Sequence, residues 1–162
     1  MARTITHKSI VDLHRTIKEK HLGINGFYRF NWDEINGNFR SGIGTPAILL
    51  ESFSSDFENT SGHSNFNNRS MSIMILDFAG KVGDYQKQED VIDTLETIAV
   101  DILSYLKKLN ETRESKFYGM ISANNFKLEK VGPIFDNMYG WNILYNIKNQ
   151  EILCFDVAKW LP

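Results

Sequence analysis

Four histidines are the first residues whose chemistry could define a site. His7, His14 and His21 recur every seven residues in a segment with a helical pattern. Two histidines that chelate one metal ion on a helix stand four residues apart, whereas seven residues correspond to about 10 Å of rise. The spacing therefore predicts three side chains on one surface face of a helix and no metal site. His63 stands in a polar segment without a second ligand nearby.

Acidic residues gather on the polar side of a helix predicted at 88–109. A two-carboxylate acid–base site needs carboxyl groups that converge in a cleft. The acidic residues of this helix instead follow one another along its polar face, which predicts a solvated surface. The alternative is a strip that faces basic residues of another subunit. The residues are Glu89, Asp90, Asp93, Glu96 and Asp101.

Other residues that could carry chemistry do not form a recognisable motif. Gly37, Gly42 and Gly44 precede a predicted strand and lack a following Gly-Lys-Ser/Thr, whereas a phosphate-binding loop opens a helix. Cys154 has apolar neighbours and is predicted to be a small core residue rather than a nucleophile. No G-x-S-x-G sequence is present. The sequence therefore predicts a protein that is not an enzyme and has no cofactor.

Composition and charge limit the partners of the chain. It has 162 residues, enough for a single domain with a sizeable core, and a net charge of −2. No basic field is available to hold a nucleic-acid backbone, and the aromatic residues alternate along strands in a way that is typical of core packing. No window approaches the roughly 20 apolar residues of a membrane span. We therefore expect no membrane and no sequence-specific nucleic acid among its partners.

Hydrophobic periodicity predicts two helices and a set of strands. The element order favours the α+β class, with an antiparallel-dominated sheet, a long helix packed on one face and an N-terminal helix. Glycine- and polar-rich loops are expected at 36–46 and 54–70. The predicted helices are 6–21 and 88–109. The predicted strands are 26–33, 47–53, 71–80, 125–131 and 138–148, followed by a short strand and an apolar tail at 151–162.

The strand at 138–148 indicates how the sheet is covered. Tyr139, Trp141, Ile143, Tyr145 and Ile147 alternate with more polar residues, so we expect the odd-numbered face to pack beneath the long helix. The strands at 47–53 and 71–80 are apolar on both faces. One long helix covers one face only, which leaves the other to the first helix, a second sheet or a neighbouring subunit.

Five apolar residues fall outside the expected core. Met138 and Leu144 lie on the wetter side of their strand, Val100 is isolated on the polar side of the long helix, and Trp160 and Leu161 occupy an apolar tail. Tryptophan often anchors protein interfaces. These five residues are predicted to lie in subunit interfaces.

Three segments of the sequence resemble a known group of proteins. They are "TPAILLE" (45–51), the long helix 88–109 between strands, and "GPIFDNMYGWNILYNI" (132–147). The order of elements is similar to that of the tail-terminator and head-to-tail joining proteins of long-tailed bacteriophages. The resemblance implies a homo-oligomeric, hexameric ring that binds tail-tube and neck proteins. It also implies a place in the tail or neck of the virion, with assembly in the host cytoplasm and no catalytic residues.

Three functions of different classes remain open at this point, the third being an enzyme whose site matches no known motif. The first is a structural subunit of a phage tail or neck, a terminator or joining ring that acts by ring assembly and docking to neighbouring virion proteins. The alternative is a small soluble binding or immunity-type protein that binds its partner through the loop at 54–70. The Ser, Asn and Gly content of that segment predicts a loop that is mobile in the free subunit and ordered in an assembly.

Overall fold

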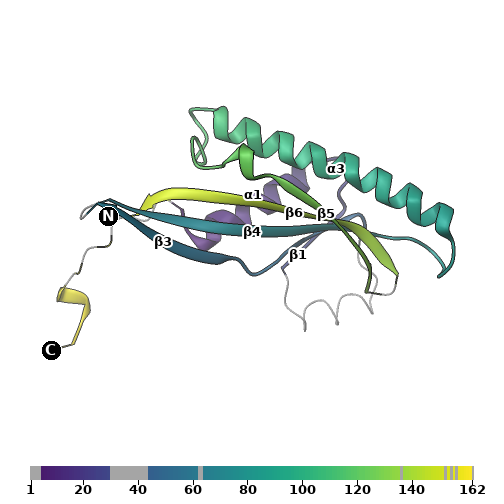
Figure 1. Cartoon of the computed structure of the whole chain (residues 1–162), viewed down its shortest axis with the longest axis horizontal. Coiled ribbons are helices and arrows are strands. Elements are labelled where there is room, and N and C mark those ends of the chain that lie inside the picture. Colours follow the sequence, from purple (N-terminus) through teal and green to yellow (C-terminus); the bar gives the residue numbers. More distant parts are fainter. Residues whose placement is uncertain are drawn as a thin grey trace.

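Six strands form one sheet in the computed structural model, and two helices lie on one of its faces (Figure 1). The structure describes residues 5–29, 44–61, 64–135, 137–151, 153, 155 and 157–161. The helices are α1 (His7–Lys20) and α3 (Tyr85–Glu111). The strands are β1 (Gly26–Arg29), β2 (Ala47–Leu50), β3 (Ser54–Ser61), β4 (Ser64–Phe78), β5 (Lys127–Ile134) and β6 (Met138–Glu151), and short 3-10 turns occur at η1 (Ala123–Asn125) and η2 (Val157–Lys159).

The sheet confirms the predicted α+β class and its antiparallel character. Its strand order is β1-β2-β4-β6-β5, with β3 also paired to β4. Every pair is antiparallel except β1 with β2. The long strand β4 pairs with β6 from Asn65 to Phe78, while its first part pairs with β3 and its last part with β2. The centre of the sheet is therefore a two-stranded ribbon of β4 and β6.

Both helices begin with side-chain caps that the local sequence supplies. Thr6 and Ser9 form a capping box at the start of α1, in which each side chain accepts from the other residue's backbone N–H. At α3, the Asp84 carboxylate accepts from the backbone N–H of Lys87 at 3.1 Å. These caps satisfy N–H groups that the first turn of a helix leaves unpaired.

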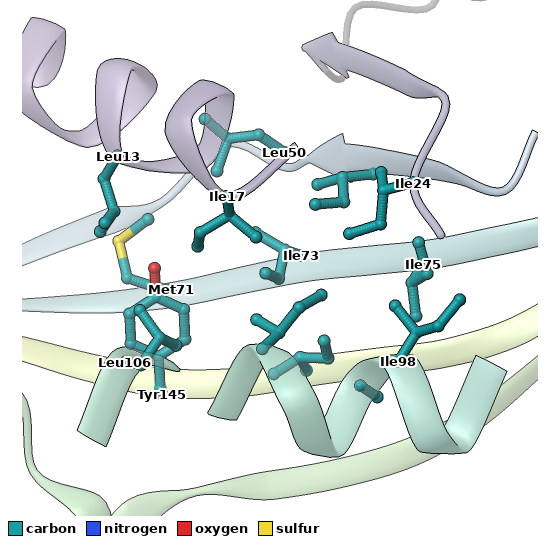
Figure 2. Packing of buried hydrophobic residues seen from close by; sticks show 14 of the residues in the cluster. Leu13, Ile17, Ile24, Leu50, Met71, Ile73, Ile75, Ile98, Leu106 and Tyr145 are labelled. Carbon is teal, nitrogen blue, oxygen red and sulfur yellow. The ribbon is translucent and has the colours of Figure 1, made fainter. Parts of the chain in front are cut away.

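The main core lies between the sheet and both helices. Figure 2 shows Leu13 and Ile17 of α1 and Ile98 and Leu106 of α3 around side chains of β2, β4 and β6. The odd-numbered residues of β6 face this core, as predicted: Ile143, Tyr145 and Ile147 are buried, and Tyr139 and Trp141 pack at its edge. The indole N–H of Trp141 also donates to the carbonyl of Ile92 on α3 at 3.0 Å.

The opposite face of the sheet carries a smaller apolar cluster. Ala47, Leu49, Leu76 and Met138 are buried there, with partly buried side chains around them. The strands predicted to be apolar on both faces therefore are so, and all four residues of β2 are buried. The first helix does not cover this second face, because α1 packs in the same core as α3.

The segment 54–70 is a β-hairpin, so the prediction of a polar loop there is wrong. Ser54 pairs with Ser70, and the pairing continues to Ser61 with Ser64. Strand formation depends more on backbone pairing and neighbours than on the composition of the segment. The inward-facing side chains of Asn67 and Arg69 form hydrogen bonds instead of apolar contacts. Asn67 donates to Glu151, and Arg69 donates to Asn149 and Glu151. A strand of this kind has no hydrophobic alternation to indicate it.

Two further expectations are corrected or fall outside the described residues. A separate short strand was predicted at 151–162. Glu151 is instead the last residue of β6, and the described residues after it contain a 3-10 turn at Val157–Lys159 but no strand. The predicted loop at 36–46 lies mostly outside the described residues, and so does the second half of the strand predicted at 26–33. Gly37, Gly42, His63 and Cys154 lie outside them as well.

Replacing Gly140 by alanine is expected to destabilise the fold by about 1–3 kcal/mol, because the new methyl group would overpack the sheet. A Cβ atom at Gly140 would lie 1.9 Å from the backbone oxygen of Ile75 on β4. Denaturant unfolding of the variant measures the change. Gly83→Ala, where a Cβ atom meets nothing within 4 Å but φ is +93°, reports the cost of backbone strain alone. An unchanged midpoint for Gly140→Ala would contradict the close approach of β4 and β6.

Candidate functional site

The segment after Glu151, here called the C-terminal arm, carries exposed apolar side chains. Its turn η2 lies away from the sheet and both helices (Figure 1). The Phe155 and Trp160 rings stack on each other with centroids 5.7 Å apart. Soluble chains rarely expose contiguous apolar surface without a use for it. The apolar residues and their exposed fractions are Leu153 57%, Phe155 71%, Val157 75%, Trp160 66% and Leu161 97%.

The arm leaves the domain at a buried polar cluster, here called the root. Arg69 and Glu151 side chains are each 6% exposed, with Nη2 of Arg69 3.5 Å from Oε2 of Glu151. Arg69 also donates to Oδ1 of Asn149 and, at 3.2 Å, to the carbonyl of Ile5. Asn67 donates to the same Glu151 oxygen at 3.1 Å. The root joins β4, β6 and the segment before α1, so it fixes the place where the arm begins.

An open groove runs between α1 and α3 on the helix-covered side of the molecule. Tyr105 of α3 lines both of its parts, which have volumes of about 470 Å³ and 210 Å³. Lys8, Lys20 and Lys116 stand along it, and the Lys116 ammonium donates to the Ser9 hydroxyl at 2.7 Å. Its apolar residues are Leu13, Ile17, Ile102, Tyr105, Leu109 and Phe117.

The five predicted interface residues do not come together in the structure. Trp160 and Leu161 lie on the arm and Val100, 49% exposed, lies on α3. Met138 is 2% exposed and packs in the second cluster of this chain's own sheet, so it is not a surface residue. Leu144 is partly buried and pairs across strands with Ser72 and Lys127, where its surroundings are polar.

His14 is not on a surface face, and this prediction is also wrong. Its ring is fully buried, Nδ1–H donates to the Ile10 carbonyl at 2.7 Å, and Nε2 accepts from the Tyr145 hydroxyl at 2.7 Å. Burial lowers the pKa of His14 from 6.5 to about 4, although the hydrogen bond to Ile10 opposes that shift. Burial also raises the pKa of the Tyr145 hydroxyl. The pair is a neutral hydrogen bond in the core.

The remaining polar residues include those considered as sites from the sequence. No three His, Cys, Asp or Glu side chains that could hold a metal ion converge among the residues that the structure describes. The carboxylates predicted to form a solvated face of α3 are exposed, and Asp101 lies 3.3 Å from His21. Ser104 and Lys107 have the spacing S-x-x-K, but both are exposed, and the Ser104 hydroxyl donates to the carbonyl of Val100 at 2.8 Å. His7 stacks on Phe53.

Sequence reasoning missed three apolar residues of the arm. Leu153, Phe155 and Val157 alternate with other residues, and that pattern suggested a short strand. The structure exposes all three. The signal that could have identified them is the combination of an apolar alternation with a position after the last paired strand. The root residues Arg69 and Glu151 were also missed, because 82 positions separate them in the sequence.

No protein-family model matches the chain, and no curated protein matches it either. No helix within the described part of the chain is long and apolar enough to cross a membrane.

Limited proteolysis of the free protein is expected to cut the arm before any other segment. Phe155 and Trp160 are exposed chymotrypsin sites outside the sheet, whereas the described residues of 54–70 are paired in a hairpin. Exposed backbone without cooperative pairing is cleaved first. Mass spectrometry of the early fragments identifies the site, and a first cut at Phe57 or Phe66 would contradict this order.

Proposed function

We propose that the protein is a structural subunit that assembles with copies of itself into a ring, in the tail or neck of a bacteriophage. It acts as a tail terminator or joining ring and docks to tail-tube and neck proteins. The observation that carries the proposal is the exposed apolar arm, whose five large side chains are 57–97% exposed. The order of elements, which resembles that of phage ring proteins, supports the particular kind of assembly.

The edges of the sheet support contacts through the arm rather than through strand pairing. Edge strands β3 and β5 carry exposed charges, among them Asp56, Glu58, Lys127 and Lys130. Charges on an edge strand oppose pairing with another chain. The arm, in contrast, exposes Trp160, and tryptophan is enriched among the residues that dominate binding energy in interfaces.

The alternative was a binding or immunity-type protein that binds its partner through a mobile loop at 54–70. The structure does not support this hypothesis, because β3 pairs there with the first part of β4. We therefore retain the assembly proposal alone.

Mass photometry of the purified full chain over a range of concentrations tests the proposal. We expect assemblies that the double variant Phe155→Ser/Trp160→Ser loses, because these two exposed rings lie on the arm. Tyr85→Ser is the matched control, since Tyr85 is an exposed aromatic residue at the start of α3 and away from the arm. Equal assembly of both variants would show that the arm does not drive assembly, and would contradict the proposal.

A further inference from the structure

The outer surface of helix α3 faces away from the sheet and carries an exposed apolar residue among charges (Figure 1). Val100, 49% exposed, lies near the middle of the helix. Four further exposed residues lie within about 40° of it around the helix axis, at 3.6 residues per turn. These five residues, here called the α3 face, are Asp93, Glu96, Val100, Ser104 and Lys107.

We propose that the α3 face binds the α3 face of a second copy, with the two helices antiparallel and in contact at Val100. The partner is a second copy because the charges of this face complement themselves. Asp93 stands seven residues before Val100 and Lys107 seven residues after it. In an antiparallel pair centred on Val100, Asp93 of each copy therefore lies opposite Lys107 of the other.

The spacing along α3 fixes one orientation of the two copies. Seven residues are about 10.5 Å of rise and nearly two turns, so Asp93 and Lys107 lie on the side of Val100 at equal distances from it. Glu96 and Ser104 lie four residues from Val100 on either side, so a carboxylate meets a neutral hydroxyl. A parallel pair would place like charges opposite each other, which is unfavourable in an interface.

The match ends outside the α3 face. Glu89 and Glu111 are each eleven residues from Val100 and carry like charges. Packed helices cross at an angle, with preferred values of about 20° or 50°, so these ends lie apart. Glu111 also lies 4.0 Å from Lys107 of its own chain. The contact therefore spans Asp93 to Lys107, with an apolar centre and a charged rim as in other protein interfaces.

This contact goes beyond the proposed function. A two-fold contact is complete with two copies, so it does not depend on a ring. One helix pair covers less surface than a standard interface of at least roughly 1,200 Å². We therefore expect weak association, which a covalent trap detects.

Disulfide trapping tests the position of the contact. The background Cys154→Ser removes the only native thiol, and Val100→Cys places a thiol where the two helices cross. Thr94→Cys is the matched control, because Thr94 is exposed on α3 about 120° around the axis from Val100. We expect a dimer yield at least about tenfold higher for Val100→Cys, since the contact raises the effective concentration of the thiols. Equal yields, or no dimer, would overturn the contact.

Charge exchange tests the antiparallel register in the same Val100→Cys background. Asp93→Lys and Lys107→Glu alone each place like charges opposite each other, so we expect each to lower the dimer yield at least about threefold. The double variant Asp93→Lys/Lys107→Glu exchanges the charges and restores opposite pairs between copies, so its yield should recover. A yield as low in the double variant as in the single variants would overturn the register.

These results separate the α3 contact from the proposed function. If Val100→Cys traps a dimer while assembly in mass photometry does not depend on the arm, the proposed function is contradicted and the α3 contact stands. If no dimer is trapped while arm-dependent assembly remains, only the α3 contact is wrong.

Discussion

Replacing Arg69 by methionine is expected to lower the free energy of unfolding by about 3–5 kcal/mol, because it leaves a buried carboxylate without its charged partner. The side chains of Arg69 and Glu151 are each 6% exposed, so water cannot solvate the remaining charge. The change also removes donors to Asn149 and to the carbonyl of Ile5. Urea unfolding followed by circular dichroism measures the loss.

The double variant Arg69→Met/Glu151→Leu is the informative control. It removes both charges, and replacement of a whole buried pair by apolar residues is often close to neutral. We therefore expect the double variant to be more stable than Arg69→Met alone. A loss below about 1 kcal/mol for Arg69→Met, the size found for exposed ion pairs, would contradict the burial of the root.

Stability at acidic pH is expected to depend on His14 by about 3 kcal/mol, because one pKa unit corresponds to about 1.4 kcal/mol. The pKa of His14 is about 4 in the folded protein and 6.5 as its ordinary value. Because the folded pKa is the lower one, the neutral pair with Tyr145 contributes its full stability above pH 6.5. That contribution falls as the pH decreases from 6.5 through 4, since the unfolded chain binds the proton first.

Unfolding of wild type and His14→Gln between pH 7 and pH 4 measures this dependence. The glutamine oxygen can still accept from the Tyr145 hydroxyl but does not titrate, so part of the acid destabilisation should disappear. His7→Gln is the matched control, because it makes the same substitution at a histidine that is exposed. The same pH dependence in wild type and His14→Gln would show that His14 is not a buried neutral residue.

The long helix and the strand β6 could be predicted because each has one strong apolar face. Leu95, Ile98 and Ile102 follow helical spacing, and Ile143 and Tyr145 alternate along a strand. These residues are buried where the pattern places them. A face that meets a continuous core must be apolar along its whole length, and that requirement is visible in a single sequence.

Features that depend on distant partners were not visible in the sequence. Strand β3 and the first part of β4 are polar. Backbone pairing of β3 with β4, and of β4 with β6, holds them in the sheet without an apolar pattern in their side chains. His14 is buried because Tyr145, 131 residues away, satisfies its second nitrogen. Arg69 is buried because Glu151 and Asn149 meet it from β6. Polar residues with such partners have no local pattern that distinguishes them from surface residues.

The candidate site was predictable only in part. Trp160 and Leu161 were identified because large apolar residues in a tail are unusual, and both are exposed on the arm. Met138 was assigned to an interface because its strand face is mixed, but Ala47, Leu49 and Leu76 form a cluster with it. The sequence could not indicate that this second face has an apolar cluster of its own.

Electron microscopy of the full-length protein, alone and with the products of the neighbouring genes, tests the central claim most directly. We expect a closed ring of identical copies in which each arm lies between two subunits. A complex that contains one copy of the chain, with Phe155, Trp160 and Leu161 facing only solvent or the core of their own chain, would contradict it.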